Sequence, residues 1–296
     1  MRKVKVGVTL PRFSEDGVGN PALHAQHAEE VGLESVWVGD HLIPVVPYLD
    51  STLVLATAAA ATKHIKVGFG VMILALRPVA WAAKQIATLQ YLSGDRVLLG
   101  IGSGGGVHGD AAWKAVGVPY HERGKRTDAA LEVLPELVRG KPTLVNGEEI
   151  TLAPGSTMPP MLIGGGTATL RRVARYGDEW YATFSSPEKV TAAMRELADL
   201  AEAYGRPAPD LTVGVSIGLG NVAASVIDDQ VRALTEYGMP EAEARQGLIT
   251  GTPAQAASRF AGLVEAGASR IVGMPFTTDW FRQRERLAEV EQLVNR

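Results

Sequence analysis

Short apolar segments recur along the whole chain and alternate with longer segments of helical character. The first covers Val4 to Leu10, where apolar residues alternate with other residues at the period of two that predicts a β-strand. Further strand-like segments lie at residues 35–38, 65–74, 97–101, 161–163, 179–183, 211–219 and 270–274. The pattern predicts eight strands in all.

Helices are predicted between these strands, and several have recognisable ends. Asn20-Pro21 is typical of an N-cap followed by the first helical position, and Gly32 is typical of a helix end. Thr252 and Gln255 have the spacing of a capping box. Other helices are expected at about 53–62, 79–92, 123–138 and 186–204, and at the C-terminal end.

The alternation of strands and helices favours an α/β protein with a closed parallel (β/α)8 TIM barrel, formed as a single domain over residues 1–296. A doubly wound sheet is the alternative. It is less favoured because no glycine fingerprint follows the first strand, and the next helix begins late, at Asn20. Asn146-Gly147 suits a two-residue turn, so a small hairpin is expected within residues 143–152.

In such a barrel the functional groups lie at the C-terminal ends of the strands. The fourth strand leads into Ser103, Gly104 and Gly105, and the fifth leads into residues 164–167, directly before a helical pattern. Backbone N–H groups in glycine-rich turns and at helix N-termini can bind an anion. The two glycine-rich strand ends therefore predict an enzyme that holds a phosphorylated cofactor.

Composition argues against several other classes of protein. The net charge is −3 and no block of like charge occurs, so neither nucleic acid nor an anionic membrane is expected as a partner. The absence of cysteine excludes disulfides and thiolate zinc sites, and it fits a cytoplasmic protein. The histidines lack metal-ligand spacing, so no metal is expected. No apolar run has membrane-spanning length, and no apolar signal segment precedes the first strand.

Five runs of residues occur in the order found in a known family. They lie at residues 31–42, 65–71, 83–104, 117–126 and 163–180. On these runs the chain resembles the bacterial luciferase-like flavin and deazaflavin oxidoreductases, and most of all their coenzyme F420-dependent branch. The resemblance implies hydride transfer between coenzyme F420 and a small organic substrate, carried out by a homodimer.

The resemblance also suggests a role for each candidate site residue. His41 would take or give the proton that accompanies hydride transfer, and Asp40 would orient the cofactor ring or bind the cofactor. The family has a non-prolyl cis peptide and a bulge beneath the ring, which would correspond here to Gly70-Val71. Cofactor contacts are further expected at the ring- and phosphate-side loop of Ser103, Gly104 and Gly105, and at the phosphate site of Gly164, Gly165, Gly166 and Thr167.

Two alternatives to this function stay open. One is an FMN-dependent monooxygenase that uses oxygen, and the other is a barrel that binds flavin or deazaflavin without catalysis. Sugar-phosphate dehydrogenases of the family carry an acidic residue where Gly105 stands here, so a sugar phosphate is not the expected substrate. The substrate would be selected by the loops at 11–20, 42–50, 106–122 and 275–282.

Overall fold

Eight parallel strands close into a barrel in the structure, a computed structural model that describes residues 3–12, 19–44, 46–105, 109–183 and 186–296. Strand β11 pairs with β1, the order continues through β2, β3, β4, β7 and β8 to β9, and β9 pairs again with β11. The predicted TIM barrel is thereby confirmed, and the doubly wound alternative is excluded. The barrel strands are β1 (Lys5–Thr9), β2 (Ser35–Val38), β3 (Lys66–Ile73), β4 (Val97–Gly102), β7 (Met161–Gly164), β8 (Glu179–Thr183), β9 (Asp210–Leu219) and β11 (Ala268–Pro275).

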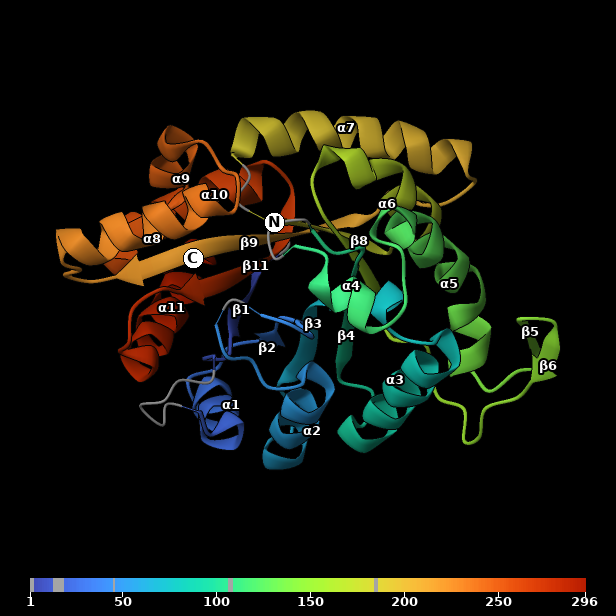
Figure 1. Ribbon diagram of the computed structural model, residues 1–296. Coiled ribbons are helices and arrows are strands. Elements are labelled where there is room, and N and C mark those ends of the chain that lie inside the picture. The colour runs from blue at the N-terminus through green and yellow to red at the C-terminus, as the bar shows by residue number, and fades with distance from the viewer. Residues whose placement is uncertain (1–2, 13–18, 45, 106–108, 184–185) are drawn as a thin grey trace.

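Helices surround the strands (Figure 1). Asn20 caps the first of them through its side chain, and Thr252 and Gln255 form the predicted capping box. The helices are α1 (Pro21–Glu30), α2 (Ser51–Ala61), α3 (Val79–Ser93), α4 (Ala111–Ala115), α5 (Arg123–Val138), α6 (Leu170–Tyr176), α7 (Pro187–Ala203), α8 (Ala224–Glu236), α9 (Glu241–Gly247), α10 (Pro253–Glu265) and α11 (Trp280–Val294). Short 3₁₀ turns occupy Leu74–Leu76, Tyr120–Glu122 and Thr167–Thr169.

A two-stranded hairpin, β5 (Thr143–Val145) and β6 (Glu148–Ile150), stands apart from the barrel and projects beside α5 (Figure 1). Asn146 and Gly147 both have positive φ, at 52° and 88°. That backbone suits a two-residue turn between twisted strands, so the predicted hairpin is confirmed.

The segment between β9 and α10 contains elements that the sequence analysis did not predict. Helices α8 and α9 lie there, together with a short strand, β10 (Ile249–Gly251), which pairs with β9 outside the closed barrel. The spacing of Ile227, Val231 and Leu234 is that of one helical face, and it was the available signal for α8.

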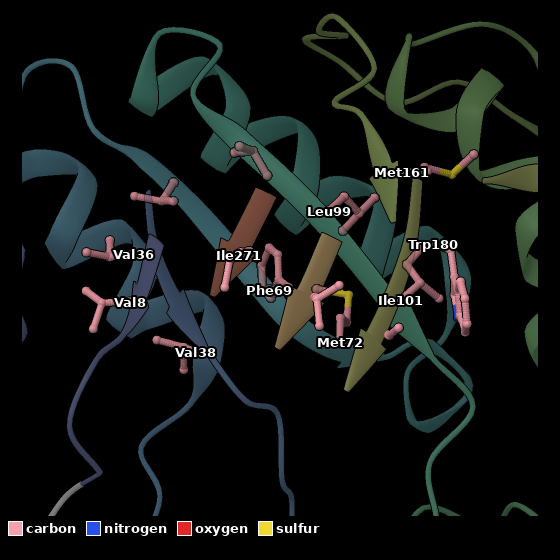
Figure 2. Packing of buried hydrophobic residues seen from close by; sticks show 14 of the residues in the cluster. Val8, Val36, Val38, Phe69, Met72, Leu99, Ile101, Met161, Trp180 and Ile271 are labelled. Atoms are coloured by element: carbon pink, nitrogen blue, oxygen red, sulfur yellow. The ribbon is translucent and has the colours of Figure 1, made fainter. Parts of the chain in front are cut away.

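Two apolar layers hold the barrel together. The outer layer fills the space between strands and helices, and the strand residues labelled in Figure 2, such as Val8, Phe69 and Leu99, belong to it. The inner layer fills the barrel itself, where the rings of Trp37 and Tyr181 lie 5.4 Å apart. A side chain at Gly68 would overlap the Trp37 ring, so glycine in this strand makes room for tryptophan in its neighbour.

The N-terminal end of the barrel is closed by a buried ion network. The Arg270 guanidinium contacts Glu34 at 3.1 Å and Glu179 at 2.6 Å, and it donates a further hydrogen bond to Thr212. Paired carboxylates and a hydroxyl satisfy this buried cation. The opposite, C-terminal end of the strands holds the cavity described next.

Candidate functional site

A cavity of about 570 Å³ lies at the C-terminal ends of the strands. Its wall includes residues from β1, β2, β3, β8, β9 and β11, and a further part comes from α8. The lining residues used below are Leu10, Arg12, Val38, His41, Tyr48, Gly70, Gln230, Leu234, Tyr237, Met274 and Phe276. This end of the barrel is where TIM-barrel enzymes place their active sites.

His41 lies on the cavity wall, three residues beyond the end of β2 at Val38. Its ring packs against the Tyr48 ring with centroids 4.8 Å apart. The Arg12 guanidinium in turn lies 5.6 Å from the centre of the Tyr48 ring. A cation, a phenol ring and an imidazole therefore follow one another along this wall, and the imidazole is the group suited to proton transfer near neutral pH.

Asp40 lies behind this wall and is buried. Its carboxylate accepts two hydrogen bonds from Arg77, at 2.6 and 2.8 Å, and one from the Ser51 hydroxyl at 2.9 Å. It also accepts the backbone N–H of Ile73 at 2.8 Å. The predicted contact of Asp40 with a cofactor stays a prediction. The observed bonds join the end of β2 to the end of β3 and to the segments that begin α2 and α3.

Strand β3 carries both features expected of a cofactor support. The Gly70-Val71 peptide is cis, and the register with β4 shifts between Phe69 and Met72. The Val71 side chain enters a notch between β4 and β7. A Cβ added to Gly102 would lie 2.6 Å from Val71 Cγ2, and one added to Gly164 would lie 2.8 Å from Val71 Cγ1. Both glycines therefore accommodate Val71, a role that the sequence did not reveal.

The two glycine-rich loops lie side by side, because Ile101 of β4 pairs with Ile163 of β7. After Ser103, Gly104 has a φ of 73° and its carbonyl accepts a hydrogen bond from Arg123 at 3.3 Å. An added Cβ at Gly105 would meet nothing within 4 Å. The first loop thus has one anchored glycine and one open glycine.

The second loop likewise has one glycine held by a hydrogen bond and one glycine with open space beside it. The Gly165 carbonyl accepts the Trp180 indole N–H at 2.8 Å, and an added Cβ at Gly166 would meet nothing within 4 Å. Thr167 begins a 3₁₀ turn, so the regular helix α6 starts only at Leu170, a little later than predicted.

The structure brings part of the predicted site together and adds to it. His41 and Gly70 line one cavity, while the side chain of the next residue, Val71, packs against Gly102 and Gly164, where the glycine-rich loops begin. Of the substrate loops, 11–20, 42–50 and 275–282 contribute to the wall, whereas residues 13–18, 45 and 106–108 lie outside the described residues. Gln230 and Tyr237 also line the cavity and were missed, because α8 was not predicted.

Within the residues that the structure describes, no group of three or more His, Asp or Glu is placed to hold a metal ion. No described helix combines the length and the apolar character needed to cross a membrane.

Comparisons with known proteins give matches over most of the chain. The family model described as luciferase-like monooxygenase matches residues 14–237. A Mycobacterium tuberculosis protein of uncharacterized function is 32% identical over 174 residues, which cover 55% of this chain and 58% of that protein. The chain thus matches less than two thirds of that relative's length.

Two named proteins match more of the chain. The F420-dependent glucose-6-phosphate dehydrogenase of Kineococcus radiotolerans is 27% identical over 297 residues, with 86% of each chain covered. Among solved structures, an F420-dependent secondary alcohol dehydrogenase in complex with an F420-acetone adduct superposes with a TM-score of 0.84. That match is 17% identical and covers 99% of this chain and 100% of the other, so it supports the fold.

Proposed function

Since the chain belongs to the luciferase-like monooxygenase family, we propose that it is an oxidoreductase that transfers a hydride between coenzyme F420 and a small organic substrate. The observation that carries this proposal is the common cavity of His41 and Gly70 at the catalytic end of the barrel. Relatives named as F420-dependent dehydrogenases favour F420 as the cofactor.

The residues present fit such a cofactor. Gly105 and Gly166 leave open space beside their backbone, so a ligand can approach them closely. The β3 bulge places Gly70 at the cavity wall with Val71 held from behind by glycines. We assign the ring support to Gly70 and Val71, the ring-side loop to Ser103, Gly104 and Gly105, and the phosphate to Gly164, Gly165, Gly166 and Thr167.

When bound, coenzyme F420 supplies the carbon that accepts or donates the hydride. His41 takes a proton from the substrate in the oxidising direction and returns it in the reducing direction. Asp40, with Arg77, holds the ends of β2 and β3 that carry His41 and the Gly70-Val71 peptide. The protein thus supplies orientation and proton transfer, and the cofactor supplies the redox chemistry.

The experiment that tests this proposal is a titration of the apoprotein with F420 and, separately, with FMN, followed by calorimetry. We expect clearly tighter binding of F420. The family's monooxygenase description favours FMN as the second candidate, and tighter binding of FMN together with oxygen consumption would establish it. Binding of a cofactor without turnover of any acceptor would support the non-catalytic barrel, and binding of neither would overturn all three.

We further propose that the protein is a cytoplasmic homodimer. The absence of cysteine suits a reducing compartment. Helices α2 and α3 pack side by side on one flank of the barrel (Figure 1) and carry a single charged residue, Lys84, between them. Large exposed apolar side chains gather on these helices, with exposed fractions of 69% at Leu53, 67% at Trp81 and 71% at Tyr91. Such a surface is typical of an interface.

A further inference from the structure

Arg12 stands out among the residues that line the cavity. It is the only described lining residue with a permanent charge, and no Asp or Glu occurs among the described lining residues. Arg12 is exposed, and within the described part of the chain it has no carboxylate partner. Its guanidinium therefore keeps its hydrogen-bond donors available to a ligand in the cavity mouth.

Two tyrosines flank this cation. Tyr48 presents its ring to Arg12 at 5.6 Å and also contacts His41. Burial raises the pKa of Tyr237, the nearby charge of Arg12 lowers it by less, and Tyr48 adds to the rise. The Tyr237 hydroxyl consequently stays protonated at neutral pH, so it adds no negative charge beside Arg12.

The lining of the cavity is otherwise largely apolar. Leu10, Val38, Leu234, Met274 and Phe276 contribute to it. An apolar lining with a few directed polar groups is the usual composition of a small-molecule site, in which the polar groups fix the ligand's orientation. Among the polar residues of this lining, Arg12 carries the permanent charge and His41 is the group suited to proton transfer.

We propose that the substrate is an organic acid with an apolar body, whose carboxylate binds Arg12 while its redox-active carbon lies beside His41. This inference rests on the proposed function. In the oxidising direction a secondary alcohol carbon gives its hydride to oxidised F420, and the hydroxyl proton passes to His41. The alcohol becomes a ketone, and the carboxylate is unchanged.

The charge balance favours a carboxylate over a phosphate. A guanidinium matches the planar carboxylate with two parallel hydrogen bonds, and one positive charge neutralises one negative charge. A phosphate dianion would leave a second negative charge in a cavity whose described lining has no other permanent cation.

The test uses two probes with the same carbon skeleton, δ-hydroxyhexanoate and its neutral amide. Reduction of F420 by each is followed by absorbance with the wild type, with Arg12→Gln and with the control Arg282→Gln. Arg282 is an exposed residue of α11 that does not line the cavity, so its substitution removes the same charge elsewhere. Hexanoate and hexanamide are also titrated by calorimetry into the protein with and without added F420.

We expect wild type and Arg282→Gln to prefer the acid, and Arg12→Gln to lose about tenfold or more in kcat/KM for the acid alone. Where neither alcohol is turned over, the preference for hexanoate over hexanamide in calorimetry decides in the same way. Equal use of acid and amide by the wild type, or a preference that survives Arg12→Gln, would overturn the proposal. Arg12-dependent hexanoate binding to a protein that does not bind F420 would contradict the proposed function alone.

Discussion

Asp40 and Arg77 form a two-point ion pair directly behind the wall of the cavity, with N–O distances of 2.6 and 2.8 Å. The Asp40 side chain is 6% exposed and the Arg77 side chain is 18% exposed. The pair joins the loop that carries His41 to the segment between the β3 bulge and α3. The pair therefore helps to fix the positions of His41 and of the Gly70-Val71 peptide, which are both predicted to lie beside the cofactor.

We expect Asp40→Asn to weaken F420 binding as well as folding. The substitution removes the carboxylate that contacts Arg77 at two points and leaves Asp50, 4.0 Å away, as the nearest described counter-charge. Loss of a partner in a buried ion pair costs about 3 kcal/mol or more, and the remaining Asp50 reduces that cost. A matched control is Glu29→Gln, because the Glu29 carboxylate accepts backbone N–H groups of His64 and Ile65 at the opposite end of β3. Urea unfolding measures stability, and fluorescence titration measures F420 affinity.

Both variants should lose stability, and only Asp40→Asn should lose F420 affinity, by about tenfold or more. Equal F420 affinity in the two variants would show that the Asp40-Arg77 pair supports the fold alone.

We expect Gly164→Ala to destabilise the protein by about 1–3 kcal/mol, because the new methyl group would press on Val71. The double variant Gly164→Ala with Val71→Ala should recover part of that loss, since the two side chains compete for one space. Gly105→Ala is the control, because nothing lies within 4 Å of its added Cβ. Denaturant unfolding of the wild type, Gly164→Ala, Val71→Ala and the double variant measures the coupling, and additive losses would refute it.

His41→Ala should lower kcat on the order of a hundredfold, the usual contribution of a general acid or base. F420 affinity should change little, because the assigned phosphate contacts lie elsewhere. His121→Ala is the control, since His121 is exposed and does not line the cavity. Steady-state kinetics and a pH profile of kcat provide the measurement. An unchanged kcat in His41→Ala would remove His41 from the mechanism.

Glu291 makes stability depend on pH in a defined direction. Burial raises the pKa of Glu291 to about 7, against the effect of a hydrogen bond from the Val6 backbone, and Glu34 adds to the rise. The folded state therefore keeps a proton that the unfolded state releases near the ordinary glutamate pKa of 4.5. Stability attributable to this group is present below that value and is lost as the pH rises towards 7.

Glu291→Gln should accordingly remove this loss. We expect the variant to be more stable than the wild type above neutral pH, with a smaller difference at acidic pH. Thermal unfolding at a series of pH values is the measurement. A difference that is the same at every pH would mean that Glu291 does not titrate in this range.

Tyr91→Glu should shift the protein towards monomers, because it places a charge on the apolar α2–α3 surface. Leu144→Glu is the control, since Leu144 is 66% exposed on the β5–β6 hairpin, away from that surface. Sedimentation velocity compares both variants with the wild type. A dimer that persists in Tyr91→Glu, or one that dissociates only in Leu144→Glu, would place the interface elsewhere.

The sequence by itself was sufficient for the order of elements and for several of their ends. A period of two located the first strand and short apolar runs located the others, and the Thr252–Gln255 capping box and the Asn146-Gly147 turn were both correct. These signals are local, since they depend on the periodicity of a strand or helix and on hydrogen bonds within one turn. The family resemblance located the cis peptide at Gly70-Val71, because it matched a short run of neighbouring residues to the family's pattern.

Only the tertiary structure decided which side chains share the site. Asp40 meets Arg77, and Val71 fills the space left by Gly102 and Gly164, because barrel closure and strand register bring distant segments into contact. The same closure adds Tyr237 of the α8 region to the cavity beside Arg12. Local periodicity carries no information about such pairings, since they depend on the register between strands and on the packing of helices around them.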